Sequence, residues 1–186
     1  MLVTVERFYI SSGHNFFGRR SLPAGPHSTH EPATLRCRAG WGIEGDRFYG
    51  YRPDYNGQIT FFSAETLAGL REHFALPMLS AGVLRRNVLI GGVDLAALIG
   101  HRFILGGVSF AGTGEARPCH WMNHAVAPGA EEWLKGRGGL RARILNDGEL
   151  ALGPTEFTLA QKISKPDAPA GFIRERAVEL RFEGGI

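Results

Sequence analysis

The sequence predicts a β-dominated α+β domain. Glycine supplies 26 of the 186 residues, about twice its usual share, and follows no fixed period. Scattered glycines indicate many tight turns, and the apolar runs between them are short, which is typical of strands. A composition of 44% hydrophobic and 21% charged residues suits one sizeable core. We therefore expect a single domain over residues 1–186, with about eight strands and two or three helices.

The N-terminal part is predicted from its alternation of polar and apolar residues. Residues 2–10 and 33–38 alternate as half-buried strands do. The loop between them, residues 11–32, is rich in Gly, Pro and His, and loops of this length often carry function. The run GQITFF at 57–62 predicts another strand, after which Ser63 is expected to cap a helix that extends to about residue 74.

The rest of the chain is predicted from its turn signals. The pair Gly106-Gly107 predicts a β-hairpin, and Asp147-Gly148 predicts a second hairpin with a type I′ turn. Pro118 begins a segment that we expect to be helical in two pieces, broken near Pro128-Gly129. The remaining expectations are the segment VLRRNVLI at 83–90, a helical turn at 94–98, a strand at 155–161 and a tail at 165–186 that fits either a strand or a short helix.

Charge and cysteine content exclude several classes of protein. The formal charge of +3 suits an anionic small molecule as well as nucleic acid. Two cysteines are too few for a disulfide scaffold, so we expect free thiols in a reducing, cytoplasmic setting. Glu6 and Arg7 interrupt the N-terminal apolar stretch, which argues against a secretory signal. The longest apolar run, 88–100, contains Asp94 and is too short to span a membrane.

Cys119 is the first candidate for chemistry. Pro118 favours the first position of a helix, so the segment EARPCHWMN at 115–123 places Cys119 at an expected helix start. Backbone N–H groups there, with Arg117 and His120 beside the thiol, would stabilise a thiolate. The alternative is that Cys119 is a small buried residue, as free cysteines often are. Cys37 lies in the alternating segment ATLRCR and is expected to belong to the core.

Arginine supplies the second group of candidates. Arg86 and Asn87 stand between apolar residues and close to two glycines, a setting in which a guanidinium and an amide could hold a phosphate. Asp46 and Arg47 lie in a glycine-rich segment, where a turn with a salt bridge is the simpler interpretation. The sequence contains no Walker loop, dinucleotide fingerprint or nucleophile elbow, which argues against those classes of enzyme.

Three segments together resemble the MOSC family, which is named for the C-terminal domain of molybdenum cofactor sulfurases. They are GIEGDRF at 42–48, RRNVLIGGVDLAALIGHRF at 85–103 and ARPCHWMN at 116–123. The resemblance implies a β-barrel with flanking helices, and a cysteine that binds the molybdenum of a pterin cofactor or carries sulfur as a persulfide. In this sequence the matching cysteine is Cys119. The cofactor contacts that the resemblance implies are Arg47, Arg86, Asn87 and Arg117, with His120 as a further candidate.

The resemblance also implies a function. Related enzymes reduce N-hydroxylated compounds, so we expect an oxidoreductase that depends on molybdenum cofactor; the alternative is a sulfur carrier that uses a persulfide. Either function would need an electron or sulfur donor protein in trans. The resemblance argues against pyridoxal phosphate, whose lysine belongs to a desulfurase domain for which 186 residues leave no room.

This chain departs from the family at position 48. Many MOSC sequences have histidine where this chain has Phe48, so the role of that histidine could fall to His14 or His120. Single-stranded nucleic acid could stack on Phe48 and its aromatic neighbours Trp41 and Tyr49, but the modest charge argues against a nucleic-acid partner.

Overall fold

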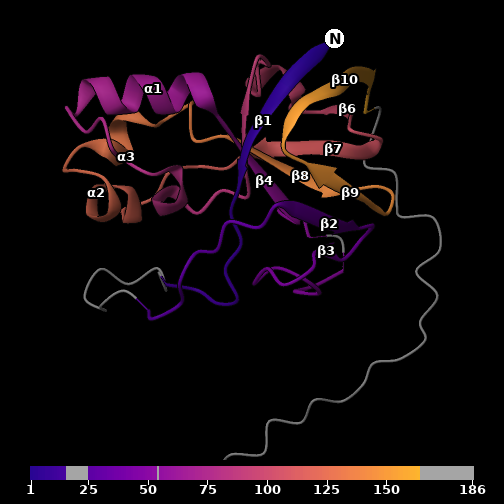
Figure 1. The fold of residues 1–186 in the computed structure, drawn as a ribbon, viewed down its shortest axis with the longest axis horizontal. Coiled ribbons are helices and arrows are strands. Elements are labelled where there is room, and N and C mark those ends of the chain that lie inside the picture. Colours follow the sequence, from indigo (N-terminus) through magenta and orange to yellow (C-terminus); the bar gives the residue numbers. More distant parts are fainter. Residues whose placement is uncertain (16–24, 54, 164–186) are drawn as a thin grey trace, which may run out of the picture.

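A closed barrel of seven strands forms the centre of the molecule (Figure 1). The structure is a computed structural model that describes residues 1–15, 25–53 and 55–163. Around the barrel the strands follow the order β1-β10-β6-β7-β8-β4-β5. Neighbouring strands are antiparallel except for β4 and β5, which are parallel. The barrel strands are β1 (Leu2–Phe8), β4 (Ile59–Ser63), β5 (Val88–Gly91), β6 (His101–Leu105), β7 (Val108–Glu115), β8 (Leu140–Ile144) and β10 (Gly153–Lys162).

Apolar side chains fill the inside of the barrel. In β1 the buried residues are Val3, Val5 and Phe8. The first two follow the predicted alternation, and a register shift between Val5 and Arg7 brings Phe8 rather than Arg7 to the inside. Phe110 packs in the centre, with its ring centroid 5.4 Å from Phe61 in an edge contact and 5.3 Å from a stacked phenylalanine ring of β6. The predicted β-barrel is therefore confirmed, and its filled interior leaves the ends of the strands and the loops to form a site.

A second, three-stranded sheet lies beside the barrel, and its strand pairing contradicts one prediction. It consists of β3 (Gly42–Ile43), β2 (Thr34–Arg38) and β9 (Gly148–Ala151), in that order. The predicted hairpin at Asp147-Gly148 is wrong, because β8 pairs within the barrel while β9 pairs with β2. Neither residue of this turn has the positive φ that a type I′ turn requires. The hairpin at Gly106-Gly107, by contrast, is confirmed between β6 and β7.

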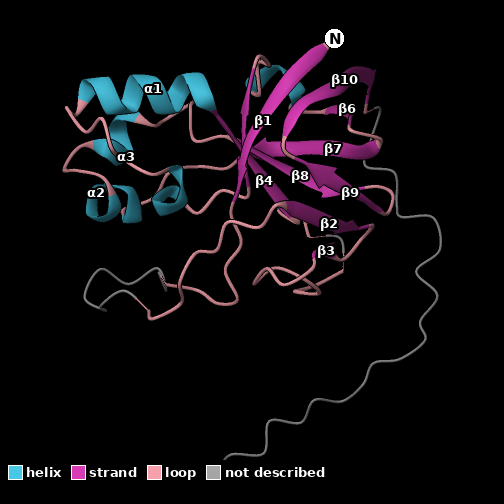
Figure 2. Ribbon diagram, viewed as in Figure 1, coloured by secondary structure: helices cyan, strands magenta, loops and turns pink. Residues whose placement is uncertain are grey.

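The α-helices gather on one side of the barrel (Figure 2). Ser63 caps the longest helix, accepting a hydrogen bond from the backbone N of Thr66 at 2.9 Å, as the sequence predicts. The segment after Pro118 is helical in two pieces, also as predicted. The helices are α1 (Ala64–His73), α2 (Trp121–Ala125) and α3 (Ala130–Trp133), with 3₁₀ turns η1 (Ala81–Leu84) and η2 (Ala96–Leu98).

None of the helices within the described ranges is long and apolar enough to cross a membrane. The tail at 165–186, for which a strand or short helix was expected, lies outside the described residues, as do positions 16–24 of the long N-terminal loop.

Candidate functional site

The carboxylate of Asp46 joins three segments at one end of the barrel, where β1 ends and β5 begins. Its Oδ2 accepts hydrogen bonds from the backbone N of Ser11 at 3.3 Å and from Nδ2 of Asn87 at 3.2 Å. The same oxygen lies 3.3 Å from Nη1 of Arg47, which confirms the expected salt bridge. The Asp46 side chain is only 1% exposed, so this pair belongs to the interior rather than to an exposed turn.

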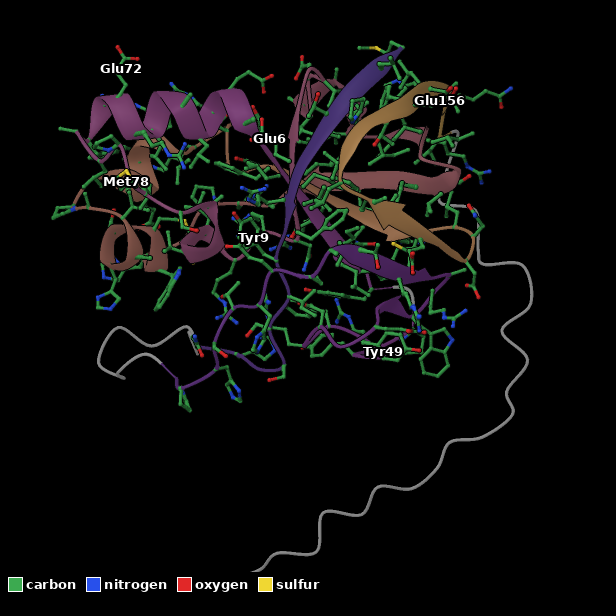
Figure 3. The ribbon with its side chains drawn as sticks, viewed as in Figure 1. Glu6, Tyr9, Tyr49, Glu72, Met78 and Glu156 are labelled. Carbon is green, nitrogen blue, oxygen red and sulfur yellow. The ribbon has the colours of Figure 1, made fainter. Side chains whose placement is uncertain are left out.

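Asn87 connects the same carboxylate to the barrel. Its Oδ1 accepts from the backbone N and Oγ1 of Thr60, at 3.0 and 2.8 Å. Its Nδ2 donates to the carbonyl oxygen of Tyr9 at 3.1 Å and to Asp46. Tyr9 lies where β1 meets the helical side of the molecule (Figure 3). Both amide hydrogens of Asn87 are therefore engaged within the protein, which indicates a structural part for a residue that the resemblance assigned to the cofactor.

Two neighbouring guanidinium groups, those of Arg47 and Arg85, carry more positive charge than their surroundings neutralise. Arg47 donates to the carbonyl oxygen of Arg85 at 3.3 Å, and Arg85 donates to Ser11 Oγ and to the carbonyl oxygen of Gly13 at 3.2 and 2.6 Å. Burial lowers the pKa of Arg47, and burial followed by repulsion from Arg47 lowers the pKa of Arg85 to about 10. Among the described residues, Asp46 is the one carboxylate that forms an ion pair with either arginine.

Arg85 was not among the site residues that the sequence predicted. It has a left-handed backbone conformation, with φ of 57° and ψ of 39°, at the end of η1. Such a conformation strains a residue with a side chain by about 1–2 kcal/mol, and strained residues are enriched at functional sites. The sequence signal for Arg85 was its place beside Arg86 in the RRN segment, but sequence does not reveal the backbone conformation that separates the two side chains.

His14 lies beside Phe48 and the arginine pair. The His14 and Phe48 rings meet edge to face, with centroids 5.0 Å apart. The guanidinium carbon of Arg47 lies over the Phe48 ring, 4.8 Å from its centroid. Burial lowers the pKa of His14, and the charges of Arg47 and Arg85 lower it further. Of the two histidines considered as replacements for the one that the family places at position 48, His14 is thus the one in contact with Phe48.

Arg86 bonds the protein backbone. Its Nε donates to the carbonyl oxygen of Gly138 at 3.0 Å, and its Nη2 donates to that of Ala116 at 2.7 Å. Burial lowers the pKa of Arg86 to about 10; Cys119 opposes this shift, whereas Arg47 adds to it. The charge of Arg86 therefore interacts with Arg47 and with Cys119, but its N–H groups donate to backbone carbonyl oxygens.

Cys119 is an exposed free thiol in the turn that follows β7, three residues after Ala116, whose carbonyl oxygen accepts from Arg86. The prediction that it begins a helix is wrong: α2 begins at Trp121, and the carbonyl oxygen of Cys119 accepts from the backbone N of Met122 at 2.8 Å. Arg86 bonds this turn through the carbonyl oxygen of Ala116, and Cys119 favours its charged form. Cys37 is buried, as predicted, and burial raises the pKa of its thiol to about 12.

Arg117 and His120, on either side of the Pro118-Cys119 pair, differ in their contacts. Arg117 is exposed, and no described residue forms a hydrogen bond or ion pair with it. His120 is half-buried, with Nδ1 3.8 Å from a carboxylate oxygen of Glu131 in α3. Both therefore stay candidates for contact with a ligand.

A pocket connects the N-terminal loop to the segment after Cys119. Its volume is about 420 Å³. Asn15 and His27 line it from the loop that the sequence marked as a functional candidate, and Trp121 and His124 line it from α2. Arg85 also reaches this pocket. The structure thus gathers Arg85 and the residues that follow Cys119 around one cavity, which is the size of many small-molecule sites.

Comparison with known proteins agrees with this architecture. Similar solved structures include the YuaD protein of Bacillus subtilis, with a TM-score of 0.68 and 20% identity over 87% of this chain and 98% of that one. YiiM of Geobacillus stearothermophilus gives a TM-score of 0.62 and 15% identity over 87% and 80% of the two chains. YiiM of Escherichia coli gives 0.58 and 16% over 86% and 72%. These likenesses establish the fold, while no curated protein matches the sequence.

The family itself is shown by the sequence. The model of the MOSC domain matches residues 44–155, which include Asp46, the Arg85–Asn87 segment and the turn at Cys119. The match covers more than half of the chain, and the barrel that it implies is the one observed. The chain belongs to the MOSC domain family.

Proposed function

We propose that this protein binds a molybdenum-pterin cofactor through Cys119 and reduces small N-oxygenated compounds. The observation that carries the proposal is that Arg85, which has no carboxylate ion-pair partner among the described residues, lines one pocket with residues that follow the exposed thiol of Cys119. Thiolate is a soft ligand of the kind that second- and third-row transition metals accept, and guanidinium groups bind phosphate. Free cysteines also suit the reducing cytoplasm that we infer for the protein.

The residues at this site fit such a cofactor. The pocket of about 420 Å³ beside Trp121 can take a compact organic group, and Arg85 lines it. Arg47 is 10% exposed and has Asp46 as its one ion-pair partner among the described residues, so a further anion would lower the free energy of the arginine pair. We assign the metal to Cys119 and the anionic part of the cofactor to Arg47 and Arg85, with Arg117 and His120 as further contacts.

The chain's own residues would divide the remaining work. When bound, the cofactor would supply the two-electron redox chemistry of the reaction. Reduction of an N-hydroxyl group takes up two electrons and two protons and releases the amine and water. A partner protein would deliver the electrons. Arg47 and Arg85 would hold the anionic cofactor, and the walls contributed by Trp121 and His124 would orient the substrate within the pocket.

Metal analysis tests the proposal. The full chain is produced in a host that makes molybdenum cofactor, and molybdenum per chain is measured in freshly purified wild type, Cys119→Ala and Cys37→Ala. We expect molybdenum in wild type, its loss in Cys119→Ala, and its retention in Cys37→Ala, since the second cysteine is buried in the core. No molybdenum in wild type, or an equal amount in Cys119→Ala, would contradict the proposal.

A sulfur carrier is the second candidate, and the exposure of Cys119 favours it. The Cys119 thiolate would attack the outer sulfur of a desulfurase persulfide, forming a new persulfide on this chain and releasing the donor cysteine as a thiolate. Intact mass after incubation with a desulfurase and free cysteine distinguishes this function. A gain of one sulfur atom in wild type that is lost in Cys119→Ser supports it, and an unchanged wild-type mass excludes it.

A further inference from the structure

Arg86 ties together three segments that are distant in sequence. Its guanidinium donates to the carbonyl oxygens of Gly138 and Ala116, and its Nη1 also donates to the carbonyl oxygen of Leu84 at 2.9 Å. These carbonyl groups belong to η1, to the turn that leads into Cys119 and to the loop before β8. A planar guanidinium can serve three acceptors in fixed directions, whereas a lysine ammonium carries its charge without this fork.

The loop before β8 holds the same turn from the opposite side. The backbone N of Gly138 donates to Glu115 Oε1 at 3.1 Å, and the backbone N of Ala116 donates to the carbonyl oxygen of Gly139 at 2.8 Å. A Cβ at Gly138 would lie 2.5 Å from the carbonyl oxygen of Ala116 and 2.9 Å from Cδ of Pro118. Because such contacts are too short, only glycine allows the loop to approach this closely. The chain from Glu115 to Pro118 is therefore fixed directly before Cys119.

Within the part of the chain that the structure describes, no ion pair neutralises the charge of Arg86. No carboxylate of residues 1–15, 25–53 or 55–163 forms a salt bridge with it. The nearby groups that favour its charged form are Cys119 and Glu115, while Arg141 and Arg47 oppose it. A partly buried cation without a carboxylate partner gives its surroundings a positive potential.

We propose that Arg86 is a positioning residue for Cys119, which fixes the turn before the cysteine through backbone carbonyl groups and places a positive charge near the sulfur. This inference rests on the proposed function in that it concerns the same cysteine, and it replaces the role of cofactor contact that the family resemblance gave to Arg86. The two parts of the role are separable, because Arg86→Lys keeps the charge and loses the fork, whereas Arg86→Gln loses both.

The charge is tested on the full chain purified without cofactor. Cys119 is alkylated with iodoacetate and with iodoacetamide at low ionic strength, and both rates are determined by peptide mapping. The quantity compared is the rate with iodoacetate divided by the rate with iodoacetamide. The ratio reports the potential at the sulfur, since both reagents attack the same thiolate. We expect it to fall about two- to fivefold in Arg86→Gln and to change less than about 1.5-fold in Arg86→Lys. Arg36→Gln is the matched control, because Arg36 is exposed in β2 and pairs with Glu149 at 3.4 Å. An unchanged ratio in Arg86→Gln would overturn the electrostatic part.

The fork is tested with Arg86→Lys, which also serves if Arg86→Gln does not fold. In the protein without cofactor we expect faster hydrogen exchange at the amides of Ala116 and Gly138, at an unchanged melting temperature within about 4 °C. In the molybdenum-loaded protein we expect kcat to fall about 10- to 100-fold while KM stays within twofold, because displaced reacting groups slow the chemical step. Wild-type exchange or wild-type kcat in Arg86→Lys would overturn the positioning role. A protein that never binds molybdenum would refute the proposed function and leave the alkylation and exchange results to decide this inference.

Discussion

Replacing Asn87 by alanine should lower the free energy of unfolding of the protein rather than weaken a contact with a ligand. The side chain makes four hydrogen bonds: two from Thr60 at 3.0 and 2.8 Å, one to Tyr9 at 3.1 Å and one to Asp46 at 3.2 Å. Asn87 is 3% exposed, so its partners would be left in the interior. At about 1 kcal/mol for each bond, with more for the buried carboxylate, Asn87→Ala should lower the free energy of unfolding by roughly 3–5 kcal/mol.

Urea unfolding followed by circular dichroism measures this change, with an unchanged m-value as evidence that the two-state transition is retained. Asn56→Ala is the matched control, because its exposed Oδ1 accepts from Arg143 Nε and Nη2 at 3.1 and 2.9 Å. Loss of this exposed contact should change the free energy of unfolding by less than about 1 kcal/mol. A loss of less than 1 kcal/mol in Asn87→Ala would refute the structural role, especially if that variant instead lost cofactor.

Three further predictions concern reactivity, pH and packing. Iodoacetamide at pH of about 8 should label Cys119 and spare Cys37, whose buried thiol has its pKa raised to about 12, and peptide mapping that finds both labelled equally would contradict this. Because burial and neighbouring arginines lower the pKa of His14 below its usual 6.5, the unfolded chain binds the proton more tightly. The free energy of unfolding should therefore decrease as the pH falls below about 6.5, and His14→Gln should show a smaller decrease in urea titrations at pH of about 7 and 5. Gly112→Ala should lower the melting temperature by about 10 °C or more, since its Cβ would lie 2.1 Å from the carbonyl oxygen of Leu98, and a change of less than 2 °C in a thermal scan would contradict that.

The elements that sequence predicts correctly are those determined by local patterns. The first strand follows from alternation, and the helix after Ser63 follows from its cap and its apolar face. The turn at Asp147 shows where local signals fail. Its carboxylate accepts from the backbone N of Ala39 at 2.8 Å and from Arg38 at 3.0 Å, so a contact with a distant strand, rather than the turn residues, determines the direction of the chain. Local turn signals do not reveal this partner, because Ala39 and Asp147 are far apart in the sequence.

The candidate site shows the same limit for side-chain roles. The motifs identify Cys119 and the RRN segment, but they do not say which arginine faces the pocket. The left-handed backbone at Arg85 turns that side chain toward the Ser11 loop and leaves Arg86 among backbone carbonyl groups. The cap of α2 likewise depends on where the chain leaves the barrel, so Cys119 precedes the helix although Pro118 predicts its start. These outcomes depend on tertiary packing, which residue spacing does not encode.

The dependence of the reaction on Cys119 is tested most directly by turnover. Wild type, Cys119→Ala and Cys37→Ala, all produced in a host that makes molybdenum cofactor, are supplied with a chemically reduced viologen as electron donor and an N-hydroxylated amidine as substrate, and the amidine product is quantified. We predict product from wild type and Cys37→Ala, and loss of at least about 99% of the rate in Cys119→Ala, because the metal would lose its protein ligand. Equal rates in wild type and Cys119→Ala would contradict the central role of this cysteine.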